Sequence, residues 1–306
     1  MKKFDVVVLT DSRYVNPTSN EAYIENLLLE DRLVVESLQK VGLKTLRLSW
    51  DDPDFDWSET KYALFRTTWD YFDRFNEFSA WLKKTAKVTR FINSGTLIKW
   101  NIDKHYLLDL HAKGINIPTT LVVETGTKTT LLKSIQKAKK ELDFNGEEFV
   151  LKPCVAGAAR HTYKFHESDW QEHENVFQQL IVQEAMMLQE FQKNIVSKGE
   201  ISMMVFGGTF THAILKIAKP GDFRVQDDYG GTVHEYHPTE KEIRFAESVV
   251  KAAPELPIYA RVDIFEDNNG KLALAELEIF EPELWFRFNP EAAAIMTKNI
   301  KNRYFS

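Results

Sequence analysis

The sequence predicts an α/β protein whose first part is a doubly wound parallel layer and whose later part contains antiparallel sheets. Two observations lead to this fold class. Near the N-terminus, a short apolar run at residues 6–9 is followed by a long helical pattern and a second strand, which is the unit of a parallel layer. Later, a Gly-Gly pair and an Asp-Asn-Asn-Gly turn each separate two apolar segments, as in antiparallel hairpins.

Length and composition are typical of a folded protein of about two domains. The 306 residues are 43% hydrophobic and 27% charged, so we expect a substantial core. The net charge of −6 argues against non-specific nucleic-acid binding, which needs a basic surface. The single cysteine, Cys154, can form no internal disulfide, and its simplest interpretation is a small packing residue. We find neither a signal peptide nor a membrane-length apolar stretch, and therefore expect a cytoplasmic protein without membrane partners.

The N-terminal third alternates strands with helices. After the strand at 6–9, apolar residues recur on one face of a helix that Gly42 ends, and strands follow at 44–48 and 62–67. The segment Arg66-Thr67-Thr68-Trp69-Asp70 ends the last of these strands, where open α/β sheets place ligand groups. A loop Arg–Asp pair beside a packed tryptophan would explain the same residues.

The middle of the chain carries two conspicuous lysines. We expect a helix from about Trp100 to Ala112, with Lys104 inside it, and a buried strand at 148–153 that ends with Lys152. An unpaired ammonium at the end of a buried strand is costly, so Lys152 needs an anion. A phosphate, assisted by Arg160 and loop amides, would satisfy it, and so would an Asp or Glu partner.

The strongest local constellation is a hairpin of strands 259–266 and 271–280. If Glu266 lies opposite Lys271, then Arg261 faces Glu276 and Asp263 faces Leu274. Side-chain alternation then places four charged residues on one face, namely Arg261, Asp263, Glu276 and Glu278, and points Ala275 the other way. Clustered carboxylates repel one another unless a cation neutralises them, and oxygen-only ligands favour a hard ion such as Mg²⁺. An ordinary hairpin with its polar face in water remains an alternative.

The order of these pieces resembles the ATP-grasp superfamily. The resemblance rests on Lys104, Lys152, the segment 188–191, and Arg261-x-Asp263 followed by Glu276-x-Glu278. It covers about residues 97–300 and resembles the branch of bacterial glutathione synthetase and the ribosomal-protein glutamate ligases. The resemblance is closer still to the ATP-grasp enzymes that include the cycloserine-forming cyclo-ligase, whose segments are similar to Arg66–Tyr71 and Trp100–Lys104.

The resemblance implies a domain organisation and a role for each group of residues. It implies a pre-ATP-grasp α/β domain at 1–96, a nucleotide lid at 97–185 and a C-terminal α+β grasp subdomain with the metal site at 186–306. ATP would be bound by Lys104, Lys152, Gln189, Glu190, Phe191 and Glu200. A Mg²⁺ or Mn²⁺ ion would be held by Asp263, Glu276 and Glu278. The catalytic cations would be Lys216, Arg224 and Arg261, and Gly230-Gly231 resembles the substrate loop. Independently of the resemblance, Arg13, Arg66 and Arg160 are candidates for binding a substrate carboxylate, because guanidinium pairs with it bidentately, and an ordinary surface ion pair is the alternative for each.

The implied activity is that of an ATP- and Mg²⁺-dependent carboxylate–amine ligase. It would form an amide through an acylphosphate on a small amino-acid-like substrate, and relatives suggest a homodimer. The alternative is a nucleotide-binding regulatory or scaffold protein of the same fold without turnover. Two departures from the family pattern concern the loop after Lys152, where Gly157 is the only glycine, and the hinge position Gln189, which is often a carboxylate. Dehydrogenase and P-loop functions are excluded because neither glycine-rich signature occurs.

Overall fold

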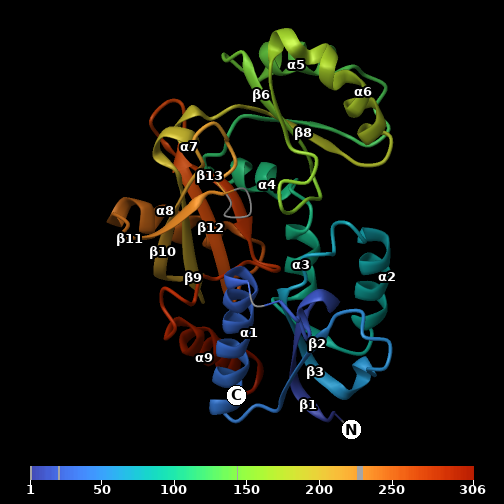
Figure 1. The fold of residues 1–306 in the computed structure, drawn as a ribbon, viewed down its shortest axis with the longest axis vertical. Coiled ribbons are helices and arrows are strands. Elements are labelled where there is room, and N and C mark those ends of the chain that lie inside the picture. Colours follow the sequence, from blue (N-terminus) through green and yellow to red (C-terminus); the bar gives the residue numbers. More distant parts are fainter. Residues whose placement is uncertain (1, 20, 143, 226–229) are drawn as a thin grey trace.

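The computed structural model describes residues 2–19, 21–142, 144–225 and 230–306, and its strands form three sheets (Figure 1). The N-terminal sheet is parallel, with the order β2–β1–β3–β4. Its strands are β1 (Phe4–Thr10), β2 (Thr45–Ser49), β3 (Thr60–Thr67) and β4 (Arg90–Ile92). Within the described ranges, no helix has both the length and the apolar composition needed to span a bilayer.

Helices cover both faces of the N-terminal sheet, which confirms the predicted doubly wound layer. Helix α1 (Ala22–Lys40) packs on the face of β1 that carries Val6 and Val8, and α2 (Phe75–Thr85) packs on the opposite face. Burial on both faces explains why β1 is an uninterrupted apolar run rather than an alternating one.

The middle of the chain forms a small antiparallel sheet at one end of the molecule (Figure 1). Its order is β5–β8–β6–β7, with β5 (Thr120–Val123), β6 (Glu148–Pro153), β7 (Tyr163–His166) and β8 (Met186–Glu190). Helices α5 (Leu131–Glu141) and α6 (Trp170–Ile181) cover one face through a shared apolar core. Because β8 belongs to this sheet, the small unit extends past the predicted boundary at residue 185.

The third sheet is antiparallel, with the order β11–β10–β9–β12–β13. Its strands are β9 (Glu200–Phe206), β10 (Thr209–Ile217), β11 (Thr232–Tyr236), β12 (Tyr259–Glu266) and β13 (Leu272–Glu278). The remaining helices are α3 (Gly95–Asn101), α4 (Tyr106–Ala112), α7 (Lys193–Lys198), α8 (Glu240–Ala252) and α9 (Ala292–Tyr304). Gly207 and Gly208 both have positive φ at the β9–β10 turn, which confirms the predicted hairpin.

The helix predicted around Lys104 is divided in two. Helix α3 ends at Asn101 and α4 begins at Tyr106, so Lys104 lies in the turn between them rather than inside a helix. Its backbone N–H is bonded to the carbonyl of Cys154 at 2.9 Å instead of to a helical partner. This bond fixes the turn against the strand end that carries Lys152. Cys154 itself is buried in the core, as the packing interpretation expected.

The register of the β12–β13 hairpin differs from the prediction. Asp263 lies opposite Glu276 and Arg261 opposite Glu278, because the turn is one residue wider than expected and a β-bulge follows Asp263. The bulge reverses the alternation before Glu276. Leu274 therefore points into the core, whereas Ala275, which was expected on the core side, lines a cavity. The four charged residues still share one face, as predicted.

Strand β13, which carries Glu276 and Glu278, is an edge strand whose open side is covered by polar groups from earlier in the chain. The Asn101 amide donates to the carbonyl of Leu277 at 2.7 Å and accepts from the N–H of Ile279 at 3.0 Å. The Tyr106 hydroxyl accepts from the N–H of Leu277 at 2.9 Å. These bonds satisfy backbone groups that an exposed edge would leave to water or to another chain.

We predict that Asn101→Ala lowers the free energy of unfolding by about 2–4 kcal/mol, because it leaves a buried carbonyl and a buried N–H of the edge strand unsatisfied. Urea denaturation followed by circular dichroism measures this change. The control is Asn302→Ala at an exposed position, which should change stability by no more than about 0.5 kcal/mol. Equal stability of the two variants would show that the Asn101 bonds do not support β13.

Candidate active site

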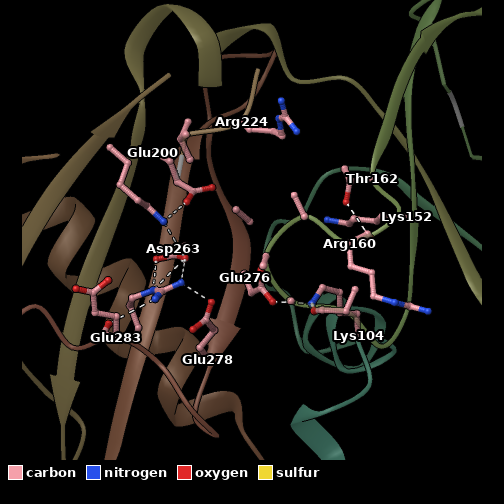
Figure 2. A pocket seen from close by; sticks show the side chains of 18 of the residues that line it. Lys104, Lys152, Arg160, Thr162, Glu200, Arg224, Asp263, Glu276, Glu278 and Glu283 are labelled. Carbon is pink, nitrogen blue, oxygen red and sulfur yellow. Dashed lines mark hydrogen bonds and ion pairs between the residues drawn. The ribbon is translucent and has the colours of Figure 1, made fainter. Parts of the chain in front are cut away.

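A cavity of about 620 Å³ lies where the small sheet, the large sheet and the N-terminal domain meet. This volume is in the range of small-molecule sites. Among the described residues, eight carboxylates and seven cationic side chains line it, so its charges nearly balance. In Figure 2, the carboxylates of β12 and β13 lie on one side, and Lys104 and Lys152 lie across from them.

Asp263 is the most strongly neutralised carboxylate of the cavity. The Arg261 guanidinium binds both of its oxygens, at 3.0 and 2.9 Å, and the Lys216 ammonium lies 3.2 Å away. The Ser202 hydroxyl donates a further bond of 2.5 Å. Burial would raise the pKa of Asp263, but the two cations lower it to about 2. Asp263 is therefore an anion at neutral pH and is held rigidly.

Glu276 and Glu278 have pKa values shifted in opposite directions. Burial opposes ionisation of both, but Glu276 accepts a 2.7 Å bond from the Lys104 ammonium, which lowers its pKa overall. Glu278 is paired with Arg261, which Asp263 shares, so burial and the nearby Glu276 charge raise the pKa of Glu278 well above its usual range. The cations beside Asp263, Glu276 and Glu278 therefore neutralise these three carboxylates only in part.

Lys152 has no carboxylate partner within ion-pair distance in the described part of the chain. Lys104, in contrast, binds Glu276 at 2.7 Å and the Ala156 carbonyl at 2.8 Å. Burial, reinforced by the Lys104 charge, lowers the pKa of Lys152. The sequence predicted two possible partners for this ammonium, an Asp or Glu side chain or a phosphate. No described Asp or Glu pairs with Lys152, which leaves an anionic ligand such as phosphate.

The cations expected to act in catalysis are held by carboxylates of the same sheet or of its loops. Lys216 lies 2.6 Å from Glu200 and is almost fully buried, and Arg224 lies 2.7 Å from Asp222. Most predicted site residues line the one cavity: Arg13, Lys104, Lys152, Arg160, Gln189, Glu190, Phe191, Glu200, Lys216, Arg224, Arg261, Asp263, Glu276 and Glu278.

Three substrate candidates lie outside the described lining of the cavity. Arg66 is only 1% exposed and pairs with Glu30 at 2.9 Å, so neither the predicted loop pair with Asp70 nor a substrate contact is found. Sequence reasoning missed this because Glu30 lies 36 residues earlier, on α1. Gly230 and Gly231 also lie outside that lining, and the residues before them, 226–229, lie outside the described residues.

The hinge at the end of β8 has its backbone groups already engaged. The N–H of Phe191 donates to the Glu148 carbonyl at 2.9 Å, and its own carbonyl accepts from Asn268 at 2.9 Å. The Gln189 side chain donates to Thr120 at 2.8 Å. Adenine contact through this hinge would therefore use the second lone pairs of its carbonyls or replace an existing bond.

The glycine-poor loop after Lys152 reaches the N-terminal domain. Gly157 lies so close to the Phe72 ring that a Cβ there would approach a ring carbon to 2.6 Å. Ala158, Ala159 and His161 have positive φ, which costs roughly 1–2 kcal/mol for each residue that is not glycine. The loop therefore makes its turns with two alanines and a histidine in a backbone conformation that glycine adopts more easily.

Three carboxylates of the cavity were missed by the sequence reasoning, namely Asp73, Glu281 and Glu283. Glu281 and Glu283 follow β13 and line the cavity beside the aromatic residues Tyr71 and Trp285. Burial and the charge of Glu276 raise the pKa of Glu281 to about 7. The available signal was the Glu-Pro-Glu sequence directly after the predicted metal strand.

The donor chemistry of the residues present suits a divalent cation bound together with a nucleotide, but the oxygens of Asp263, Glu276 and Glu278 do not all lie within 4.8 Å of one another before ligands bind. These three residues supply only oxygen donors, which hard ions prefer, and they face the Lys152 ammonium, which has no carboxylate partner among the described residues. Their present partners are internal cations. A metal would take over the carboxylates while phosphates take over the lysines, so the two ligands compensate for each other's broken ion pairs.

Two family models match this chain. Residues 117–282, more than half of the chain, match the ATP-grasp domain of prokaryotic glutathione synthetase. Residues 6–93 match the N-terminal domain of the D-cycloserine synthetase DcsG. A curated relative, the cycloserine biosynthesis protein DcsG of Streptomyces lavendulae, is 27% identical over 286 residues, which cover 88% of this chain and 92% of that protein.

Solved structures share the fold over nearly the whole chain. The crystal structure of D-cycloserine synthetase DcsG superposes with a TM-score of 0.83 at 24% identity, covering 97% of this chain and 99% of that one. A RimK-domain ATP-grasp protein from Sphaerobacter thermophilus gives 0.65 at 14% identity, covering 96% and 98%. The D-alanine–D-alanine ligase of Bacillus anthracis, solved with ATP, gives 0.62 at 14% identity, covering 98% and 96%.

We predict that Lys152→Met weakens binding of a non-hydrolysable ATP analogue with Mg²⁺ by about tenfold or more, because a charge-assisted contact to phosphate is lost. Its melting temperature should not fall, since the substitution removes a half-buried ammonium that lacks a carboxylate partner in the described chain. Isothermal titration calorimetry and thermal melting measure the two effects. The exposed control Lys84→Met should change neither. Unchanged nucleotide affinity would exclude Lys152 as a phosphate ligand.

Proposed function

We propose that this chain, which belongs to the ATP-grasp family of prokaryotic glutathione synthetase and is an ATP-dependent ligase, joins a carboxylate to an amine. The proposed intermediate is an acylphosphate. The substrate proposed is a small amino-acid-like molecule, and the similarity to the cycloserine biosynthesis protein DcsG supports this proposal. The observation that carries the proposal is the Lys152 ammonium, which has no carboxylate partner among the described residues and faces Asp263, Glu276 and Glu278 across the cavity.

The first step is phosphoryl transfer. A substrate carboxylate oxygen attacks the γ-phosphorus of ATP, the bond to the β-phosphate oxygen breaks, and ADP leaves with that bond's electron pair. Lys104 and Lys152 would bind the phosphates, and Lys216, Arg224 and Arg261, which line the same cavity, would stabilise the transferred group. In such transfers the protein mainly positions the groups and stabilises charge, which suits a site lined by fixed cations.

The second step forms the amide. The amine nitrogen attacks the acyl carbon, phosphate leaves, and the nitrogen loses a proton. The metal, which we propose is Mg²⁺ held by Asp263, Glu276 and Glu278, supplies positive charge to the phosphates when bound. Glu200, which pairs with Lys216, is proposed to bind the ribose, and the end of β8 at Gln189–Phe191 the adenine. Arg13 and Arg160, which line the cavity, remain candidates for the substrate carboxylate.

We predict Mg²⁺-dependent release of ADP when the protein is incubated with ATP and a panel of D- and L-amino acids and their derivatives. Hydroxylamine should convert the acylphosphate to a hydroxamate, which mass spectrometry detects. Glu276→Gln should reduce turnover by about a hundredfold or more, because it removes a carboxylate aimed at the metal. The exposed control Glu36→Gln should retain full activity. Tight ATP binding without ADP release for any acid would instead favour a regulatory protein.

We also predict that ATP and Mg²⁺ bind with positive coupling. Either ligand alone must break an internal pair such as Lys104–Glu276 and leaves one of its two side chains without a partner. When both bind, the phosphate pairs with Lys104 and the metal with Glu276. The affinity of the ATP analogue should therefore rise by about tenfold or more when Mg²⁺ is added, beyond the effect of forming the free Mg–nucleotide complex. A chain carrying Glu276→Gln should lose most of this coupling. Equal affinity with and without metal in the unaltered protein would contradict the exchange.

A further inference from the structure

The segment Arg66–Tyr71, which the fold places outside the sites proposed for nucleotide and metal, is bonded at several points to residues 281–286. The Trp69 indole donates to the Glu281 carbonyl at 2.9 Å. Tyr71 and Glu281 line the same cavity, and the Tyr71 hydroxyl partly offsets the rise in the pKa of the Glu281 carboxyl. More than 200 residues of chain separate these partners, so the contact exists only through the tertiary fold.

Arg66 reaches the same segment through an intermediary. It pairs with Glu30 at 2.9 Å, and the two Glu30 oxygens accept from the N–H groups of Leu284 and Phe286 at 3.0 and 2.8 Å. All of these groups are buried. A buried guanidinium–carboxylate pair with two additional amide donors gives the backbone at 284–286 little freedom.

Asp70 completes the scaffold by holding the segment itself. It accepts from the Trp50 indole at 2.8 Å and from Arg74 at 2.7 Å. The Tyr71 ring also packs edge-on against Phe280, with ring centroids 4.9 Å apart, directly before Glu281 in the chain. Burial raises the pKa of the Tyr71 hydroxyl well above its ordinary value, so it remains a neutral donor.

The charge of the Glu281 carboxyl group restricts which ligands it can bind. Glu283 is already paired with Arg287, whereas no ion pair of Glu281 is found among the described residues. The ionised form of Glu281, whose pKa of about 7 a bound ammonium would lower, repels the substrate acid and attracts a cation or an N–H donor. Tyr14 and Trp69, in edge-to-face contact at 6.3 Å, form an aromatic wall of the same cavity, which also favours a cation.

We propose that Glu281 binds the amino group of the substrate, and that Arg66, Trp69 and Tyr71 are positioning residues that aim its carboxylate into the cavity. This inference rests on the proposed ligase function, and it identifies the residue that would bind the amino group of the ligase substrate. The metal carboxylates Glu276 and Glu278 lie on the strand, and Glu281 follows in the loop, so one short stretch of chain would supply both the metal and the amine contacts.

The test uses two probes that separate the charges of an amino acid. Alaninamide carries the ammonium without a carboxylate, and propionate carries the carboxylate without an ammonium. Each is titrated by calorimetry into the full-length protein saturated with the ATP analogue and Mg²⁺. We expect Glu281→Gln to weaken alaninamide by about tenfold or more while leaving propionate and the nucleotide within about twofold.

The positioning residues are tested by the same comparison of alaninamide and propionate affinities. Tyr71→Phe and Trp69→Phe should weaken alaninamide by about three- to tenfold without changing propionate affinity, and Glu281→Asp should recover part of the binding lost in Glu281→Gln. The exposed control Glu255→Gln should bind both probes as the unaltered protein does. A purely structural role would weaken both probes together and lower the melting temperature.

The outcomes separate this inference from the proposed function. If the unaltered protein binds the nucleotide but does not bind alaninamide, or if Glu281→Gln binds it unchanged, the amine assignment is wrong and the ligase proposal stands. If neither nucleotide nor metal binds, the ligase proposal itself fails.

Discussion

The carboxylates of β12 and β13 can share one cavity only because cations lie between them. Arg261 bridges Asp263 and Glu278, Lys216 joins Asp263 to Glu200, and Lys104 joins the cluster at Glu276. Without these pairs, several buried negative charges would repel one another and lose their hydration. The same pairs hold each functional side chain in place before any ligand arrives. The same ion pairs therefore neutralise the buried carboxylates and hold the site's side chains in place.

The fold supports this arrangement by fixing the edge strand that carries two of the carboxylates. Asn101 and Tyr106, from the helices flanking the Lys104 turn, bond directly to the backbone of β13. The position of Lys104 relative to Glu276 is therefore set by backbone bonds as well as by the ion pair. The N-terminal domain supports the segment that follows β13 in a comparable way, through Trp69 and Glu30.

Sequence reasoning predicted what depends on local periodicity and could not predict what depends on distant partners. Alternation along two neighbouring strands was enough to place Arg261, Asp263, Glu276 and Glu278 on one face, and an error in register did not change that. The bulge that turns Ala275 into the cavity has no local signal. Neither the pairing of Arg66 with Glu30 nor the contact of Trp69 with Glu281 can be read from spacing, because each joins segments that only the fold brings together.

When a nucleotide and a divalent ion bind, Lys104 and the three carboxylates should exchange their internal partners for these ligands, and Lys152, which has no carboxylate partner in the described chain, should gain a phosphate. A crystal structure of the protein with a non-hydrolysable ATP analogue and Mn²⁺, located by its anomalous signal, tests this most directly. The account predicts the metal bound to oxygens of Asp263, Glu276 and Glu278, with Lys104 and Lys152 on the phosphates and the Lys104–Glu276 pair broken. A metal bound elsewhere, or phosphates held away from both lysines, would contradict it.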